Sequence, residues 1–389
     1  MYKRQDQVGA VVGHVLSVYR AAGYRAPKSD GTRGGTGAGL LDIYLEDLGS
    51  QAVYGYCDTD VDVPGRGPYD APAFCALDND FAEFPHNTAL QNLQVTAAHE
   101  LFHAVQFAYD YTEDAWFMEA TATWAEDELY DSINDNRQYL RQSPLRQPRE
   151  SLDQFVRGGF SLRQYGEWIF FRYLSETYPQ SRAGMPVIVR RLWQRVDGSR
   201  GAADDYSIRA VNRELRSRGT DLRRFYAKFA DANRRPQRSY EEGAAYPVAP
   251  ARTFAFRPRS HDTGRRGARL DHLSSTTARF TPSASMRGWR LHVSVDLPDK
   301  ALGSAAVLTT YDRKGRPSRR IMPITKAGNG TLVVNFGTPK VARAELTLSN
   351  AGIRYVCWQG TLNNGVQYSC KGKSKDDNRP MRYRVWATR

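Results

Sequence analysis

The sequence predicts an α+β domain followed by an all-β domain, and three observations support this division. Apolar residues recur mainly at helical spacing up to residue 250, whereas short runs of alternating apolar and polar residues follow from residue 251. Charge changes at the same place, since residues 251–389 carry 26 Lys and Arg against 8 Asp and Glu, while residues 1–250 carry 29 against 34. The stretch 234–252 contains the proline and glycine typical of a boundary. At 389 residues, the chain also exceeds what one hydrophobic core usually organises.

The first domain is expected to open with a helix and to place two strands before its main motif. Apolar residues at helical spacing predict an amphipathic helix over residues 6–22. The glycine-rich stretch 28–39 lacks the lysine and the strand–helix context of a phosphate-binding loop, so we interpret it as a link. Residues 40–45 and 73–77 have the character of strands, and the glycine- and proline-rich residues 58–72 form a loop between them.

The most informative motif is HELFH at residues 99–103. In a helix, His99 and His103 lie one turn apart on the same face, so both imidazoles can reach one Zn²⁺ at about 2.0–2.1 Å. Glu100 stands beside them, close enough to take a proton from a water at the metal. The flanking residues are apolar nearly all round, as in a buried helix, and burying His, Glu and His without a metal would be costly. One alternative is an accidental match on a solvated helix, which is rare in a chain with only 7 His, and the other is a pair of core histidines.

A catalytic zinc needs a third protein ligand and one open position. The next strong helical segment, residues 116–124, contains Glu119. The short polar link 110–114 would let this second helix fold back antiparallel to the first and bring Glu119 to the two histidines. We therefore expect His99, His103 and Glu119 to form the metal site.

HELFH followed by WFMEATATWAE resembles the gluzincin zinc metallopeptidases, and most of all the peptidase MA-like group. The resemblance implies an α+β zincin-like catalytic domain, with Glu100 as general base and a zinc ion held by His99, His103 and Glu119. One position departs from the pattern, because Ala120 stands where that segment usually has glycine. Alanine is small and favours helices, so the departure does not displace Glu119.

The resemblance implies roles for two further residues. Glu126 lies on the same helical face as Glu119 and matches another acidic position of the pattern, where it would hydrogen-bond a ligand histidine. The alternative for Glu126 is a surface carboxylate. Tyr165 lies in the segment 161–174, which resembles the tyrosine-bearing helix of the family, and would donate to the developing oxyanion. The alternative for Tyr165 is a core aromatic, since the chain has 22 tyrosines.

Cysteine usage points to an oxidising compartment. Cys57 with Cys75, and Cys357 with Cys370, are local pairs without the C-x-x-C spacing of zinc sites, so we expect two disulfides. The alternative is four buried free thiols, which behave as small hydrophobes. The opening residues 1–5, MYKRQ, read like a translated sequencing adapter. We therefore expect an N-terminally truncated chain that has lost its signal peptide.

The remaining predicted elements are helices before residue 250 and strands after it, because the spacing of apolar residues changes there from helical to alternating. Helices are expected over residues 161–174, 187–196, 206–216 and 222–232. Strands are expected over residues 253–256, 289–297, 305–311, 319–324, 331–336, 344–349, 355–358, 366–370 and 382–388. Many short strands without a helical segment indicate a β-sandwich of the immunoglobulin or jelly-roll kind.

These observations favour a secreted zinc metallopeptidase, an endopeptidase acting on proteins or peptides. Its catalytic domain would span residues 1–250 and a basic β-sandwich accessory domain residues 251–389. The basic domain would contact acidic polymers or cell surfaces, but its scattered charges and lack of a recognition motif argue against specific nucleic-acid binding. No apolar run approaches the ~20 residues of a membrane span. The alternative is a catalytically silent adhesion protein, in which a peptidase-like scaffold carries a β-sandwich that binds acidic polymers.

Overall fold

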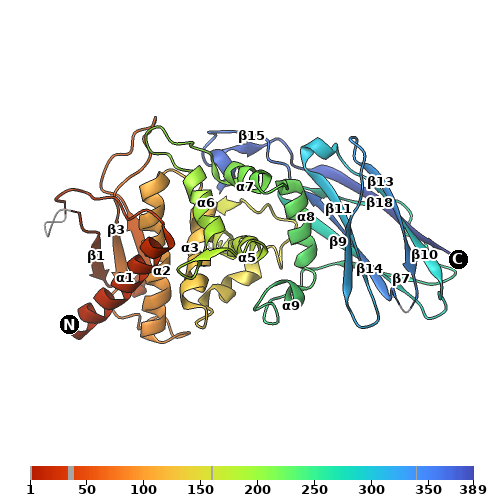
Figure 1. The fold of residues 1–389 in the computed structure, drawn as a ribbon, viewed down its shortest axis with the longest axis horizontal. Coiled ribbons are helices and arrows are strands. Elements are labelled where there is room, and N and C mark those ends of the chain that lie inside the picture. The colour runs from red at the N-terminus through yellow and green to blue at the C-terminus, as the bar shows by residue number, and fades with distance from the viewer. Residues whose placement is uncertain (1, 34–38, 159–160, 339) are drawn as a thin grey trace. The chain divides into compact units, whose positions relative to one another are not determined.

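The computed structural model describes residues 2–33, 39–158, 161–338 and 340–389 (Figure 1). These residues fall into two units, one formed by residues up to 139 together with 161–210, and the other by residues 140–158 together with 211–389. The first unit mixes helices with a small sheet, and the second is dominated by β-strands. The α+β and β-sandwich classes expected from the sequence are therefore both present. Among the described residues, no helix is both long and apolar enough to cross a membrane.

The sheet of the first unit has three strands, in the order β1-β3-β2. Strand β3 (Phe74–Asp78) lies between β1 (Asp42–Glu46), to which it is parallel, and β2 (Gly55–Asp58), to which it is antiparallel. Cys57 of β2 and Cys75 of β3 face each other in register and form a disulfide. Strand β2 was not predicted from the sequence, because its four residues include a glycine and show no extended apolar run.

Helices are the main regular secondary structure of the first unit. They are α1 (Tyr2–Ala22), α2 (Ala89–Asp110), α3 (Ala115–Tyr130), α4 (Arg163–Gly166), α5 (Trp168–Thr177) and α6 (Val187–Arg195). A capping box between Thr88 and Gln91 starts α2, and every residue of this helix from 95 onward is buried. The ring of Phe102 on α2 packs against Trp124 of α3 and Trp193 of α6, with centroids 6.4 Å away in both cases. Helix α2 is therefore a buried helix, as its nearly all-round apolar sequence predicted.

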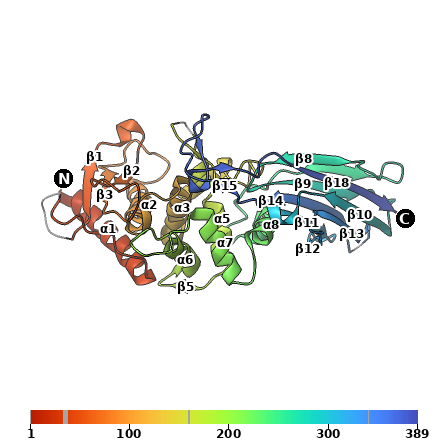
Figure 2. The same cartoon turned by 90° about the horizontal axis from the view of Figure 1, so that it is seen from above.

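The second unit contains two mainly antiparallel sheets, most of whose strands are labelled in Figure 2. Buried apolar side chains from both sheets form one core. The first sheet has the order β13-β10-β18-β8, and the second has the order β12-β11-β14-β9-β7. The strands of these two sheets are β7 (Arg252–Phe256), β8 (Arg266–Leu270), β9 (Ser274–Pro282), β10 (Trp289–Asp296), β11 (Ser304–Tyr311), β12 (Pro317–Ile321), β13 (Asn329–Phe336), β14 (Arg343–Asn350) and β18 (Arg379–Thr388). Side chains from both sheets, among them Val293, Phe336, Leu346 and Val385, meet in one apolar cluster, so this unit is a β-sandwich.

Several segments before residue 250 belong to the sandwich unit. Helix α8 (Leu222–Ala232) packs on the five-stranded sheet, where Ala227 contacts Ala305 and Val307 of β11. Two ion pairs reinforce this contact, Arg319 with Asp231 at 2.8 Å and Arg234 with Glu345 at 3.1 Å. The sequence predicted a division near residue 250, whereas residues 211–250 fall in the same compact unit as the sandwich. The turn-rich composition near residue 250 marks a change of secondary structure within that unit.

Candidate metal centre

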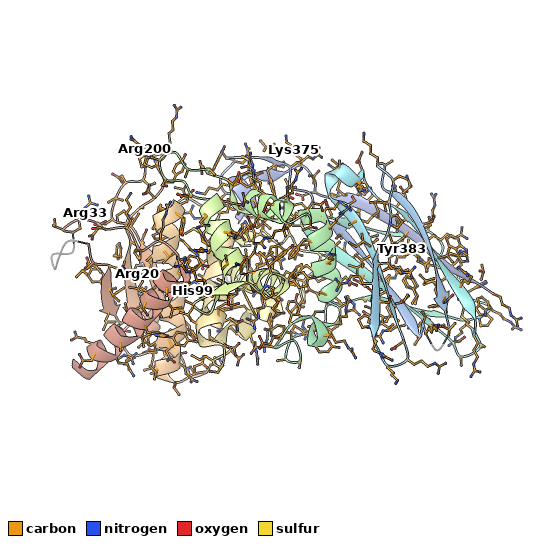
Figure 3. All side chains as sticks on the ribbon, in the orientation of Figure 1. Arg20, Arg33, His99, Arg200, Lys375 and Tyr383 are labelled. Atoms are coloured by element: carbon orange, nitrogen blue, oxygen red, sulfur yellow. A yellow bond between two sulfur atoms is a disulfide. The ribbon has the colours of Figure 1, made fainter. Side chains whose placement is uncertain are left out.

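Three side chains from α2 and α3 converge inside the first unit. His99 and His103 lie one turn apart on α2, and the connection 111–114 turns the chain so that α3 brings Glu119 to them. Nε2 of His99 lies 3.2 Å from Oε2 of Glu119, and Nε2 of His103 lies 3.6 Å from the same oxygen. His99 is seen among the helices of this unit in Figure 3. The structure thus brings together all three residues that the sequence suggested as metal ligands.

The spacing of these atoms fits a small tetrahedral metal. Two ligand atoms held at about 2.0–2.1 Å from Zn²⁺ at the tetrahedral angle lie about 3.3–3.4 Å apart. The nitrogen–oxygen separations of 3.2 and 3.6 Å bracket that value. Two nitrogens and one carboxylate oxygen also match the donor set of catalytic zinc sites. The residues present therefore fit a zinc ion.

The outer nitrogen of each histidine has its own hydrogen-bond acceptor. Nδ1 of His99 lies 2.6 Å from Oε1 of the buried Glu126, and Nδ1 of His103 lies 2.7 Å from Oε1 of Gln106. Because both partners accept, each Nδ1 carries a proton and each Nε2 is the atom left to bind a metal. Glu126 therefore lies where the resemblance implied, and it is not a surface carboxylate.

Gln106 is a site residue that the sequence reasoning missed. Its side chain is fully buried, and its Nε2 donates to the carbonyl oxygen of Met118 at 2.9 Å and to Oγ1 of Thr121 at 3.1 Å. These two bonds turn the amide oxygen toward His103. The signal available in the sequence was its position three residues after His103, on the same helical face.

Glu100 is buried next to the three converging side chains. Only 7% of its surface is exposed, and its Oε2 has no hydrogen-bond partner among the described residues. Burial raises the pKa of Glu100, while His99 and His103 act in the opposite direction. A buried carboxylate oxygen without a partner is unfavourable unless water or a ligand satisfies it. The geometry leaves this oxygen available to accept a proton from a water in the site.

Strand β2 lies directly against the helix that carries Glu100. A Cβ added to Gly55 would come 2.9 Å from Cγ2 of Thr96 and 3.0 Å from Cγ of Glu100, so glycine is required for this close approach. The sulfur atoms of Cys57 and Cys75 also contact the carbonyl oxygen of Glu100. The disulfide and the glycine together fix the strand beside the motif.

The charges around the site are strongly coupled. Burial alone would lower the pKa of His99, but its hydrogen bonds to Glu119 and Glu126 raise it well above the usual value. Burial alone would raise the pKa of Glu119, but the two histidines lower it. Burial raises the pKa of Glu126 to about 7, against the opposing effect of His99. The histidines and carboxylates therefore form one electrostatically coupled cluster, in which the protonation of each group depends on its neighbours.

A hollow of about 360 Å³ opens beside the site, lined in part by Tyr54, His99, Glu100, Tyr139 and Tyr165. The ring of Tyr165, on α4, lies 5.9 Å from that of His99. The charge of Glu119, followed by burial, raises the pKa of Tyr165, so its phenol stays protonated and can donate. The ring of Tyr139 lies 5.0 Å from that of Tyr165, and sequence reasoning did not single it out.

A second cluster in the first unit is acidic and is formed by Asp78, Asp80 and Glu83, of which Asp78 has a structural role. Oδ1 of Asp78 accepts hydrogen bonds from the backbone amides of Leu48 and Gly49, and its Oδ2 accepts from that of Phe81. Asp78 therefore holds the turn after β1 and the turn after β3. The histidine-containing cluster remains the candidate metal centre.

Comparisons with known proteins give no functional assignment. No family model matches the sequence, and no curated protein does. Among solved structures, a mutant of the Escherichia coli periplasmic inhibitor of g-type lysozyme is 14% identical, covers 36% of this chain and 100% of its own, and has a TM-score of 0.20. A surface-associated copper-binding protein of Methylomicrobium album BG8 is 8% identical. The match covers 36% of this chain and 98% of the copper-binding protein, with a TM-score of 0.19. TM-scores this low bear on neither the fold nor the function of this chain.

Proposed function

We propose that the chain is a secreted zinc metallopeptidase of the gluzincin type, and that it cleaves peptide bonds within proteins or peptides. The observation that carries this proposal is the convergence of His99, His103 and Glu119 at zinc-like spacing, with an acceptor on the outer nitrogen of each histidine. Two disulfides, Cys57–Cys75 and Cys357–Cys370, support the secreted assignment, because such bonds persist in oxidising compartments.

The residues of the site divide the chemistry between them. A zinc ion held by the three ligands would supply Lewis-acid polarisation of the scissile carbonyl and of water. Glu100, with its unpartnered Oε2, takes the proton from the attacking water and passes it to the leaving amine. Tyr165, kept protonated, donates a hydrogen bond to the oxygen that gains negative charge. Glu126 holds the ring of His99 in orientation.

Metal content tests the first half of the proposal. We expect about one zinc per chain by elemental analysis, and we expect His99→Ala or His103→Ala to remove it, since two protein ligands bind zinc weakly. His86→Ala, at an exposed histidine, is the matched control and should keep the metal. Stoichiometric zinc in the His99 and His103 variants would place the metal elsewhere and contradict the assignment.

Turnover tests the second half. We expect Glu100→Gln to keep zinc and to lose most peptidase activity on a mixed peptide library, by a factor of about 10²–10⁴, because the general base is gone. Glu46→Gln, at an exposed glutamate, is the matched control and should leave activity unchanged. A wild-type chain that binds zinc at this site and cleaves no peptide would instead favour the silent adhesion protein.

A further inference from the structure

Two adjacent hollows in the second unit lie at the start of α8. One has a volume of about 490 Å³ and the other about 540 Å³. They adjoin each other, because they share five lining residues: Gly219, Thr220, Arg223, Arg224 and Lys300. We call this feature the α8 groove. It lies outside the candidate metal centre, and its chemistry is independent of whether zinc binds there.

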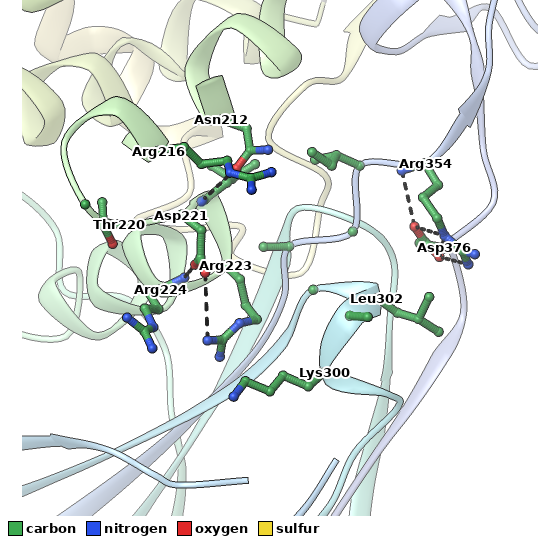
Figure 4. Close-up of a pocket in the computed structure, with 17 residues that line it drawn as sticks. Asn212, Arg216, Thr220, Asp221, Arg223, Arg224, Lys300, Leu302, Arg354 and Asp376 are labelled. Atoms are coloured by element: carbon green, nitrogen blue, oxygen red, sulfur yellow. Dashed lines mark hydrogen bonds and ion pairs between the residues drawn. The ribbon is translucent and has the colours of Figure 1, made fainter. Parts of the chain in front are cut away.

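The α8 groove is lined mainly by positive charge. Its cationic residues are Arg216, Arg223, Arg224, Lys228, Lys300 and Arg354, and its acidic ones are Asp221 and Asp376. Asp376 is already neutralised, because it pairs with Arg354 at 2.6 Å and with Arg379 at 3.0 Å. Figure 4 shows Arg223, Arg224 and Lys300 around the hollow, with Arg354 held by Asp376 on its other side. Among the described lining residues, Asp221 is left as the one acidic group facing the remaining cations.

The cations at the centre of the groove have little compensation. The side chain of Arg223 is only 12% exposed, yet its one ion pair in the described structure is with Asp221, at 4.0 Å. Arg224, Lys228 and Lys300 form no ion pair within the described residues. Burial, together with the charge of Arg224, lowers the pKa of Arg223. A desolvated guanidinium with one distant partner is stabilised when an anion binds beside it.

The form of the groove discriminates between classes of polyanion. Its charges are spread over two hollows, which suits a chain with repeated negative groups better than a single small ion. None of the described residues lining it is aromatic, so it offers no platform on which nucleic-acid bases could stack. We propose that the α8 groove binds a polysaccharide that carries carboxylate or sulfate groups.

The test measures binding by the full chain, using fluorescence anisotropy of labelled oligosaccharides. The probes are a heparin decasaccharide for sulfate and an oligogalacturonate for carboxylate, with neutral dextran and a single-stranded DNA oligonucleotide for comparison. We expect at least one acidic oligosaccharide to bind more tightly than the DNA, with an affinity that falls as salt rises. The double variant Arg224→Glu/Lys300→Glu should weaken that binding about tenfold or more, because two charges of the groove are reversed.

A charge-matched control distinguishes binding in the α8 groove from non-specific attraction to the positive charge of the whole unit. Arg287→Glu/Arg290→Glu changes the net charge by the same amount at exposed arginines that do not line the groove, and it should weaken binding less than about threefold. If the glutamate pair at the groove unfolds the protein, Arg224→Gln/Lys300→Gln should still show an intermediate loss. Equal losses in the groove and control variants, tighter binding of the DNA, or no binding of either acidic oligosaccharide would overturn the proposal.

Discussion

At the scale of single residues, the candidate metal centre depends on side chains that hold the ligands as much as on the ligands. The HELFH motif marks His99 and His103, but a histidine presents a useful nitrogen only when its other nitrogen is fixed. Glu126 does this for His99 and Gln106 for His103. The role of Glu126 could be expected from an acidic residue at a known spacing from Glu119. The role of Gln106 could not, because glutamines are common on helices and this role depends on contacts that form only in the folded protein.

The role of Gln106 gives a prediction that rests on the proposed zinc site. Gln106→Leu removes the acceptor for Nδ1 of His103, and we expect zinc affinity to fall about 10- to 100-fold without loss of the site. Competition with a chromogenic chelator measures that affinity directly, independently of turnover. Gln94→Leu, on the same helix but only partly buried, is the control. Unchanged zinc affinity in a folded Gln106→Leu protein would show that the amide is not needed to orient His103.

At the scale of elements, strand β2 shows how a short segment can shape the site. Gly55 lets the strand approach α2, because an added methyl group would lie 2.9 Å from Cγ2 of Thr96 and 3.0 Å from Cγ of Glu100 on that helix. We expect Gly55→Ala to lower the free energy of unfolding by about 1–3 kcal/mol, through overpacking. If the chain is the proposed peptidase, Gly55→Ala should also reduce turnover more than it reduces zinc affinity, because the displaced side chain is that of Glu100.

Gly65→Ala is the matched control for Gly55→Ala. A Cβ at Gly65 would meet no atom within 4 Å, so the same chemical change should leave stability nearly unaffected. Chemical denaturation and peptide hydrolysis measure the two effects. If Gly55→Ala and Gly65→Ala behave alike in both assays, the close approach of β2 is not a constraint on the site.

The strands also show what sequence patterns could and could not predict. Each of the nine runs expected after residue 250 overlaps a strand or bridge-paired segment, because alternating apolar residues mark one buried face. Strands β8 and β9 and the two-residue strand β17 (Lys373–Ser374) were missed. Strand β9 is rich in serine and threonine and buries hydroxyls by pairing them, as Thr277 does with Thr347 at 2.9 Å. A strand that satisfies buried polar groups in this way shows no hydrophobic alternation.

At the scale of the whole molecule, the two units are not two consecutive stretches of chain. Residues 140–158 group with the sandwich although residues on both sides of them belong to the first unit. Within this segment Asp153 is fully buried, and it pairs with Nε2 of the equally buried His272 at 2.8 Å. Neither composition nor hydrophobic periodicity could predict that residues 140–158 belong to the sandwich unit, because this depends on a few polar contacts between residues far apart in sequence.

The ion pair between Asp153 and His272 makes the stability of the second unit depend on pH. Burial alone would lower the pKa of His272, but Asp153 and Asp377 raise it from 6.5 to about 10. A folded pKa above the unfolded one means that the stabilisation is fully present below about pH 6.5 and is lost as pH rises through about 10. We expect the free energy of unfolding of this unit to fall by a few kcal/mol between pH 6.5 and 10, because this is the order of magnitude that the raised pKa of His272 implies.

Calorimetry of the full chain across this pH range, with variants to assign the transition, measures the effect. His272→Gln should lower the transition temperature at about pH 6 and should flatten its decline toward pH 10, since the group that loses its proton is absent. His292→Gln changes a histidine on the same sandwich that hydrogen-bonds Thr388, and it should retain the wild-type pH dependence. The linkage to His272 would be refuted if His272→Gln showed the same decline between pH 6.5 and 10 as the wild-type chain.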